Sequence, residues 1–330
     1  MKGSDNDVLI IGGGAAGCAA ASELSRRGLR SVIVETADKL GGLAGSHCCK
    51  STEHCERCDA CLPIDVRRDA LNATDVTVMT NSRIVDARTD DGIVVGIARP
   101  GGTEQMHFRS AIVAIGALPF DPALDPRLGY GSVPGVLSSL DVDRGVRDGT
   151  FNIADGASIA VIQCVGSRDA NRGAPYCSKV CCKYAYQLAR HLQSARSLDI
   201  TFFHMDWRPL DGDLEALSRW KASGASVIRS RPAEVVESNG RPAVRYADPV
   251  DDVHERTFDA VMLTVGLLPS PENERLASLL GVSLDDLGFF LPAHGKVLAA
   301  GCCTGPKDID ESVKEGIAAA GRAMSIMEGR

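Results

Sequence analysis

The chain has 330 residues, 44% of them hydrophobic, so it is long enough for two domains with separate cores. Its formal net charge is -7 and no long basic run occurs, so we expect no nucleic-acid partner. No apolar stretch reaches the roughly 18 residues that a membrane span needs. We expect no signal peptide, and twelve cysteines without an export signal predict thiolate ligands or redox thiols in the cytoplasm rather than disulfides.

A predicted strand, turn and helix open the chain. Residues 7–11 are a short apolar run that is typical of a buried parallel strand. Residues 12–17 read GGGAAG and match the pattern G-x-G-x-x-G. Residues 15–27 have a helical composition and end at a glycine, and a second strand is predicted at residues 30–34. This order of elements is that of a dinucleotide-binding unit.

Each glycine of the turn has a physical role in such a unit. Gly12 permits the tight turn, Gly14 lets the backbone approach a pyrophosphate, and Gly17 lets helix and strand pack closely. The N-terminus of the helix favours the negative charge of the phosphates. Glu35 ends the second strand, where its carboxylate can accept a hydrogen bond from a ribose hydroxyl. The spacing therefore predicts a nucleotide site.

The segment KLGG at residues 39–42 resembles the FAD-binding half of the glutathione and thioredoxin reductase superfamily, which implies FAD rather than NAD. Cys302 stands where that superfamily has an aspartate beside the flavin, and Cys302 and Cys303 also fit small buried residues. The flavin contacts that the resemblance implies are Gly12, Gly14, Ala15, Ala16, Gly17, Glu35, Thr36, Lys39, Gly41, Gly42, Leu43, Ile84, Ala114, Gly116, Gly301, Cys302, Asp308 and Ile309.

A cysteine-rich loop follows at residues 47–61, HCCKSTEHCERCDAC. Three cysteines spaced C-x2-C-x2-C can wrap an iron–sulfur core. Zinc is the competing interpretation, because four thiolates, or three with a histidine, also suit it. Free or redox thiols are a third. The possible site consists of Cys55, Cys58 and Cys61, with Cys49 or Cys48 as the fourth ligand.

The rest of the chain predicts two α/β units. Strands are expected at 75–79, 82–87, 92–97, 108–116, near 158, and at 198–204, 225–228, 259–265 and 296–300, with helices at 179–196, near 214 and at 309–327. Residues 117–135 read as a linker. The fold class is α/β with two doubly wound, thioredoxin-reductase-like domains, the second inserted into the first. Residues 1–116 and 266–330 form the FAD-binding domain, including the loop 47–61, and residues 117–265 form the inserted domain.

A second cysteine group follows the predicted strand near residue 158. A doubly wound domain would hold a dinucleotide at this strand-to-helix turn, but near the end of the strand only Gly166 remains of the glycines. Cys177 and Cys181, four residues apart, are expected on one face of the following helix. With Cys164 and Cys182 they give four thiols that can converge on one metal cluster, although core thiols remain an alternative.

The segments CVGSRD, YCSKVCCKYA and AGCCTGPKDID strongly resemble the A subunits of heterodisulfide reductases. This resemblance implies FAD in the first domain and one [4Fe-4S] cluster, or two, with Cys164, Cys177, Cys181 and Cys182 as ligands. It also implies a homodimer and partners similar to the B and C iron–sulfur subunits of that family. Two departures stand out. The length resembles the short, sulfur-oxidation type of the family, and Gln187 stands where a lysine often follows the paired cysteines.

The predicted function is that of an oxidoreductase, an electron-transfer subunit in a cytoplasmic complex of sulfur metabolism. Two other functions stay open. One is an NAD(P)H-dependent, thioredoxin-reductase-like dithiol oxidoreductase, which the lost second glycine motif disfavours. The other is a non-catalytic scaffold with structural FAD and zinc.

Overall fold

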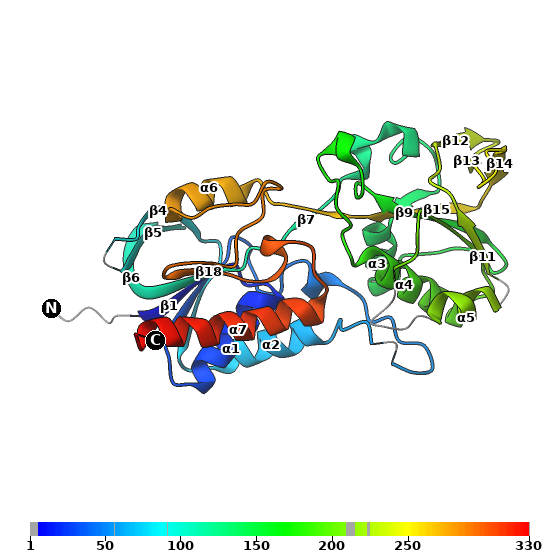
Figure 1. The fold of residues 1–330 in the computed structure, drawn as a ribbon. Coiled ribbons are helices and arrows are strands. Elements are labelled where there is room, and N and C mark those ends of the chain that lie inside the picture. Colours follow the sequence, from blue (N-terminus) through cyan, green and yellow to red (C-terminus); the bar gives the residue numbers. More distant parts are fainter. Residues whose placement is uncertain (1–5, 56, 91, 209–214, 223–224, 330) are drawn as a thin grey trace. The chain divides into compact units, whose positions relative to one another are not determined.

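The computed structural model describes residues 6–55, 57–90, 92–208, 215–222 and 225–329 (Figure 1). The chain divides into two compact units. The first comprises Met1–Ser46, Asp59–Leu118 and Leu268–Arg330, and the second comprises His47–Cys58 and Pro119–Leu267. The expected boundaries at 116 and 266 thus become 118 and 268. Residues 47–58, expected in the FAD-binding domain, group with the second unit instead.

An eight-stranded sheet forms the centre of the first unit. Its parallel strands lie in the order β18, β6, β1, β2, β3, so the chain switches direction between β1 and β6. These strands are β1 (Asn6–Ile11), β2 (Ser31–Val34), β3 (Val76–Met79), β6 (Gly102–Val113) and β18 (Val297–Ala299). Antiparallel strands extend the sheet, namely β4 (Arg83–Arg88), β5 (Ile93–Arg99) and β17 (Ala293–His294). A switch of this kind is where α/β sheets bind nucleotides.

Side-chain alternation along β1 gives the first unit two buried layers. Val8 and Ile10 pack with the helices α1 and α7, whereas Leu9 and Ile11 pack on the opposite face with residues of β5 and α6. The helices are α1 (Ala15–Arg26), α2 (Leu62–Asn72), α6 (Glu272–Leu280) and α7 (Ile309–Met327). Figure 1 shows α1, α2 and α7 side by side beneath the sheet.

The second unit has a five-stranded parallel sheet in the order β11, β10, β9, β15, β8. Its strands are β8 (Val136–Ser138), β9 (Ser158–Val165), β10 (Asp199–His204), β11 (Ser226–Arg229) and β15 (Ala260–Val265). The helices α3 (Ser139–Arg147), α4 (Cys181–Ala195) and α5 (Ala216–Ala222) belong to it, as does a separate antiparallel sheet of β12 (Glu234–Ser238), β13 (Arg241–Ala247) and β14 (Val253–Thr257). β7 (Leu118–Pro119) pairs with β16 (Leu267–Leu268) where the chain passes between the units.

Several expected elements differ from the observed ones. The segment 117–135, expected as a linker, contains two short 3-10 helices, η2 (Pro122–Leu124) and η3 (Pro126–Leu128). Its Phe120 and Leu128 are buried in the second unit. The helix expected near residue 214 is seen as α5, and residues 209–214 lie outside the described part of the chain. Sequence analysis did not predict α2, α3 or the sheet of β12 to β14.

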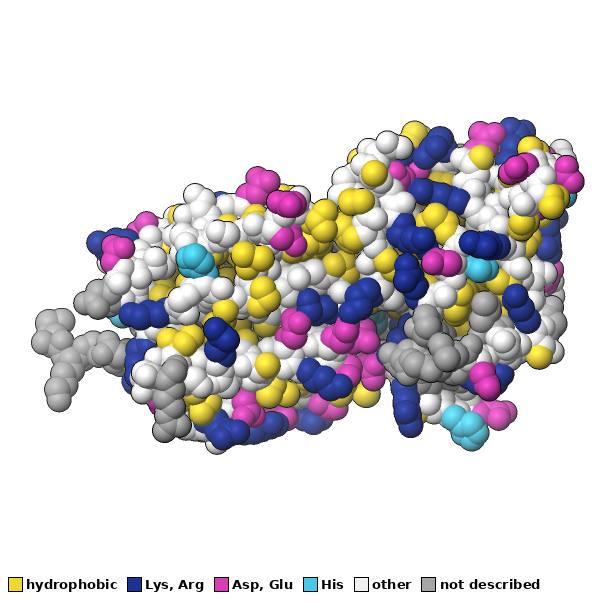
Figure 2. All heavy atoms as spheres, in the orientation of Figure 1, with side chains coloured by type: hydrophobic (Ala, Val, Ile, Leu, Met, Phe, Trp, Pro, Cys, Tyr) yellow, Lys and Arg dark blue, Asp and Glu magenta, His cyan; other side chains and the backbone are white. Residues whose placement is uncertain are grey.

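Among the described helices, none combines the length and the apolar character that crossing a bilayer requires. Figure 2 shows acidic and basic side chains interspersed over the face in view. The visible charge therefore does not gather into one large patch of a single sign.

Candidate flavin and cysteine sites

The first glycine turn has two glycines that the protein's own backbone requires. Gly12 has a φ of +102°, and a Cβ there would lie 2.6 Å from the carbonyl oxygen of Ala114. A Cβ on Gly17 would lie 2.0 Å from the carbonyl oxygen of Gly12. Gly14 differs, because among the described residues its Cβ would meet only Gly42 Cα, at 4.0 Å. That contact does not require a glycine, so this position suits the close approach of a ligand.

Glu35 supports the same turn. One carboxylate oxygen accepts the backbone N–H of Gly13 at 2.7 Å, and the other accepts that of Ala37 at 2.8 Å. The Gly13 carbonyl in turn accepts the N–H of Gly41 at 2.8 Å, which joins the second glycine pair to the turn. The acid that follows β2 therefore lies beside the glycine turn.

The predicted flavin residues gather at one edge of the sheet. Ala114 and Gly116 follow β6 and Gly301 follows β18, so they lie at the carboxyl ends of parallel strands on one side of β1. Ala15 and Ala16 are buried in the first turn of α1, while Thr36, Lys39 and Leu43 are exposed. Ile84 is the exception. It is buried in the apolar layer on the opposite side of β1 from α1, and its carbonyl accepts a hydrogen bond from Arg275.

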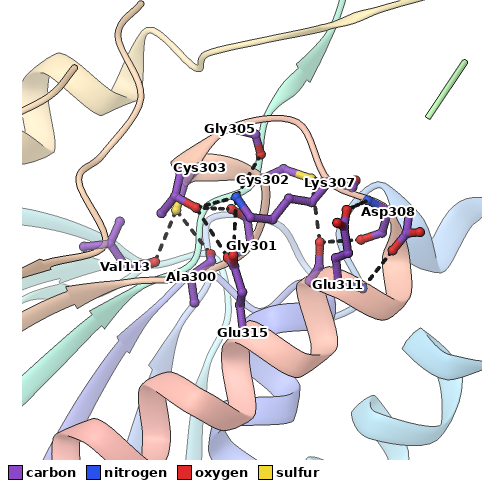
Figure 3. Close-up of polar contacts among 12 residues, drawn as sticks. Val113, Ala300, Gly301, Cys302, Cys303, Gly305, Lys307, Asp308, Glu311 and Glu315 are labelled. Carbon is purple, nitrogen blue, oxygen red and sulfur yellow. Dashed lines mark hydrogen bonds and ion pairs between the residues drawn. The ribbon is translucent and has the colours of Figure 1, made fainter. Parts of the chain in front are cut away.

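A polar network holds the 3-10 helix η5 (Gly301–Thr304) against α7 (Figure 3). Glu315 accepts the N–H of Gly301 at 2.9 Å, and Lys307 Nζ lies 3.5 Å from the same carboxylate and donates to Thr304 at 2.7 Å. Asp308 caps α7 by accepting the N–H of Glu311 at 2.7 Å. The predicted residues Gly301, Asp308 and Ile309 are thereby fixed. Sequence analysis missed Lys307 and Glu315.

Cys302 and Cys303 are neutral thiols rather than substitutes for a carboxylate. Cys303 is fully buried, its Sγ donates to the carbonyls of Val113 and Ala300, and burial raises its pKa to about 12. Cys302 donates to the carbonyl of Lys307 at 3.3 Å, and burial likewise raises its pKa. Figure 3 shows the Cys303 side chain pointing toward both of its acceptors. Cys303 thus fits the interpretation of a small buried residue, whereas Cys302 is partly exposed.

A bulge positions Cys164 at the end of β9. Ile162 pairs with Leu263 on β15, but the next pair is Val165 with Val265. One strand therefore has an additional residue, and Cys164 takes a left-handed backbone conformation with a φ of +60°. Bulges of this kind commonly lie beside functional sites, where they turn a side chain out of the regular alternation.

The other cysteines of this group surround the start of α4. The helix begins at Cys181, and Lys179, two residues earlier, has a φ of +62°. Cys177 therefore lies in the preceding loop, and the prediction that Cys177 and Cys181 share one helix face is wrong. Cys164, Cys181 and Cys182 are buried, and Cys177 is partly exposed.

The thiols of this group influence one another electrostatically. Burial, together with the neighbouring cysteines, raises the pKa of Cys164 to about 11 and that of Cys181 well above its usual value. These thiols are neutral unless a cation compensates their charge. Within the described ranges, no three His, Cys, Asp or Glu side chains are arranged to hold a metal ion. The four cysteine thiols are the type of ligand that an iron–sulfur cluster requires. Their positions among the described residues are not those of a complete metal site.

Phe120 covers Gly166, the glycine directly after β9. Gly166 has a φ of +67°, and a Cβ there would lie 1.9 Å from the Phe120 ring. Phe120 is held by a hydrogen bond from its N–H to the carbonyl of Gly266 at 2.9 Å. The Phe120 ring therefore packs directly against Gly166, and this position requires a glycine.

A buried ion pair fixes the cysteine-rich loop to the second unit. Lys50 Nζ lies 2.8 Å from Asp143 Oδ2, and both side chains are only 2% exposed. Asp143 also accepts the N–H of Cys48 and the hydroxyl of Tyr184, both at 2.7 Å. Burial alone would raise the pKa of Asp143, but the hydrogen bond from His47 and the charge of Lys50 hold it well below its usual range. Sequence analysis missed this cluster.

Helix α4 also holds the backbone of the loop 47–58. Gln187 Nε2 donates to the carbonyl of Arg57 at 3.3 Å, and His191 Nδ1 donates to that of Ser51 at 2.7 Å. Tyr184, Gln187 and His191 have the spacing i, i+3, i+7 of one helix face, which is a signal that the sequence contains. Gln187, noted above as a departure from the family pattern, thus has a structural partner.

The predicted second cysteine set is spread over both units. Cys49 and Cys55 are exposed and Cys58 is partly exposed, all three in the loop 47–58 of the second unit. Cys61 is exposed and precedes α2 in the first unit. Cys48 is buried, and burial raises its pKa to about 12. A second metal site stays a prediction.

Comparison with known proteins identifies the relatives of this chain. Residues 6–169 match the family model described as pyridine nucleotide-disulphide oxidoreductase. The chain is 37% identical over 241 residues to an iron-sulfur A subunit of the CoB--CoM heterodisulfide reductase of Methanopyrus kandleri. It is 35% identical over 243 residues to the A subunit of the H(2):CoB-CoM heterodisulfide,ferredoxin reductase of Methanothermobacter thermautotrophicus. Both alignments cover 66% of this chain and 37% of the relative, so the chain matches well under half of their length.

Solved structures show the same fold over almost the whole chain. Thioredoxin reductase of Lactococcus lactis superposes with a TM-score of 0.66 at 20% identity, covering 99% of this chain and 100% of that one. Thioredoxin reductase of T. acidophilum gives a TM-score of 0.66 at 19% identity, covering 98% and 99%. The predicted α/β, thioredoxin-reductase-like fold class is confirmed.

Proposed function

We propose that this chain transfers electrons between FAD and an iron–sulfur cluster. The premise is that the chain is a homologue of the heterodisulfide reductase A subunits and has a pyridine nucleotide-disulphide oxidoreductase domain. The observation that carries this proposal is the pair of sites on separate units. One is a glycine turn with an open position at Gly14, and the other is a turn with four thiols.

FAD would bind at the carboxyl edge of the first sheet. The open approach at Gly14 and the ordered Glu35 carboxylate support this position, together with the fixed loop before α7. The bound flavin would supply the exchange of two electrons with a substrate and of single electrons with a cluster. The protein would supply binding, orientation and the electrostatic surroundings.

The cluster would be a [4Fe-4S] group with Cys164, Cys177, Cys181 and Cys182 as its ligands. Three of these thiols are buried, and neighbouring cysteines raise the pKa of Cys164 and of Cys181. A cationic iron core would stabilise the thiolate form of these residues. Cys49, Cys55, Cys58 and Cys61 remain candidates for a second cluster.

The chain would act as one component of a cytoplasmic complex in sulfur metabolism, of the short sulfur-oxidation type. The relatives' names describe them as A subunits of reductases for the CoB-CoM heterodisulfide, which supports partner subunits. We propose iron–sulfur proteins similar to the B and C subunits of that family as these partners, and a homodimer as the core.

The NAD(P)H-dependent alternative is disfavoured because the turn after β9 lacks the glycine motif that would hold a second dinucleotide. Rapid bleaching of the bound flavin by NADH or NADPH would restore that alternative. A structural role for FAD with zinc would be favoured if protein prepared without oxygen contained zinc and no iron.

The test is the metal and flavin content of protein prepared without oxygen. We expect one FAD and about four irons per chain, the content of one cubane cluster, or about eight if the loop cysteines hold a second. In Cys164→Ala the irons of one cluster should be lost while FAD stays bound. Cys18→Ala is the matched control, because Cys18 is also a buried thiol but lies in α1 of the first unit. Unchanged iron in Cys164→Ala would contradict the assignment.

A further inference from the structure

Three buried polar side chains on neighbouring strands of the second sheet have unpaired atoms. Gln163 on β9 is 5% exposed, Thr264 on β15 is 0% exposed and His204 on β10 is 8% exposed. Both amide atoms of Gln163, the hydroxyl of Thr264 and Nδ1 of His204 have no hydrogen-bond partner in the described part of the chain. Buried polar atoms are nearly always paired in native proteins, so this polar row requires an explanation.

The three residues lie at one level and on one face of the sheet. Ile162 pairs with Leu263 on one side and with Phe203 on the other. Gln163, Thr264 and His204 are the next residue of each strand, so they point to the opposite face from those three. That face is the one on which Val161, Phe202 and Met262 pack with residues of α4. The polar row is thus the end of this buried face, at the carboxyl edge of the sheet.

The polar row also adjoins the four thiols. Gln163 directly precedes Cys164 in the bulge. Thr264 directly precedes Val265, whose carbonyl accepts a hydrogen bond from Cys181 Sγ at 3.7 Å. Cys182 belongs to the same buried cluster as Val161 and Met262, which lie two residues before Gln163 and Thr264. The polar atoms therefore lie where the sheet faces the start of α4.

We infer that Gln163 and Thr264 are positioning residues that donate hydrogen bonds to sulfur atoms of the cluster at Cys164, Cys177, Cys181 and Cys182. This inference rests on the proposed function. Gln163 supplies an amide N–H and Thr264 a hydroxyl, and both thiolate and sulfide sulfur accept such bonds. The reduced cluster has one more negative charge than the oxidised one, so the donors stabilise it preferentially and raise the reduction potential.

The experiment is a redox titration of the cluster in the full chain, with FAD bound and oxygen excluded, followed by electron paramagnetic resonance. Thr264→Val and Gln163→Met keep the side-chain size and remove the donors. We expect each substitution to lower the midpoint potential of the cluster by about 59 mV. For a one-electron couple this equals about a tenfold change in the ratio of oxidised to reduced cluster at a fixed potential. Iron and FAD contents should equal those of the wild type.

Thr201→Val is the matched control. Thr201 is also 0% exposed, its hydroxyl has no partner among the described residues, and it lies on β10 of the same sheet. It shares its face with Phe203, which packs with Tyr246 and Phe258 away from the polar row. We expect its potential to equal that of the wild type, because its hydroxyl points to the other side of the sheet.

Other outcomes would overturn the inference in distinguishable ways. Unchanged potentials in Thr264→Val and Gln163→Met, with full iron content, would overturn the hydrogen bonds and leave the proposed function intact. Wild-type protein without iron would overturn the proposed function and this inference together. If Thr264→Val fails to assemble a cluster, Thr264→Ser decides. A wild-type potential with the serine hydroxyl supports the inference, and a failure to assemble like that of the valine variant overturns it.

Discussion

The Lys50–Asp143 ion pair is a buried contact between two opposite charges, so we expect it to matter for stability. We predict that Asp143→Asn lowers the free energy of unfolding by about 3–5 kcal/mol, because it leaves the buried Lys50 ammonium without a countercharge. Urea unfolding of both proteins measures the difference. Asp148→Asn, which removes an exposed partner of Arg147, is the control and should have little effect. A loss below about 1 kcal/mol for Asp143→Asn would contradict the prediction.

The Asp143 carboxylate should also affect how the free energy of unfolding changes at acidic pH. The pKa of Asp143 in the folded chain is held below its usual value. The carboxylate therefore contributes fully to the free energy of unfolding above the unfolded pKa of about 4, and this contribution is lost as the pH falls through the folded pKa. Asp143→Asn has no such group. The stability difference between the two proteins should therefore shrink as the pH falls below about 4.

At the scale of elements, α1 and α7 approach each other through a glycine. A Cβ on Gly316 would lie 2.1 Å from the carbonyl oxygen of Ala16. We predict that Gly316→Ala destabilises the chain by at least about 2 kcal/mol, because two helix backbones must separate. Thermal unfolding checks this. Gly321→Ala in the same helix meets no described atom within 4 Å and should stabilise by up to about 1 kcal/mol. Equal effects at both sites would contradict the argument.

Elements that depend on local residues could be predicted from the sequence. The first glycine turn and α7 have their strand, cap and helix signals within a few residues, and α7 was predicted with its observed bounds. The start of α4 was placed two residues early, because the left-handed conformation of Lys179 has no local signal in a non-glycine residue. The bulge at Cys164 depends on pairing with β15, about a hundred residues later, which local patterns do not reveal.

The loop 47–58 shows the same limit over a longer range. Its cysteines could be recognised as a group from the sequence, but the unit to which the loop belongs could not. Lys50 of the loop contacts Asp143 and Tyr184, which lie far along the chain from it. The edge at which Ala114, Gly116 and Gly301 lie was more predictable. These residues follow parallel strands of one sheet, whose carboxyl ends meet at one edge whatever the intervening sequence.

At the scale of the whole molecule, the loss of one proposed cofactor should leave the other bound. We predict that Gly14→Ala weakens FAD binding at least about tenfold, because its methyl group is tolerated by the described protein atoms but obstructs the approach of the ligand. The iron content should stay that of the wild type, since the four thiols belong to the other unit. Flavin release measured by fluorescence, together with iron analysis, tests this. Gly321→Ala serves as the control, and loss of iron in Gly14→Ala would contradict separability.

Because the first unit is discontinuous in sequence, the residues of the second unit are all synthesised before those of the first unit are complete. The second unit comprises residues 47–58 and 119–267, so all of its residues have been made once synthesis passes position 267. The first unit still lacks β18, Gly301 and the capped start of α7 at that moment. The nascent chain can therefore assemble the cysteine turn while its flavin edge is incomplete. All four cysteines proposed as cluster ligands are thus synthesised before Gly301 and the start of α7, which belong to the proposed flavin edge.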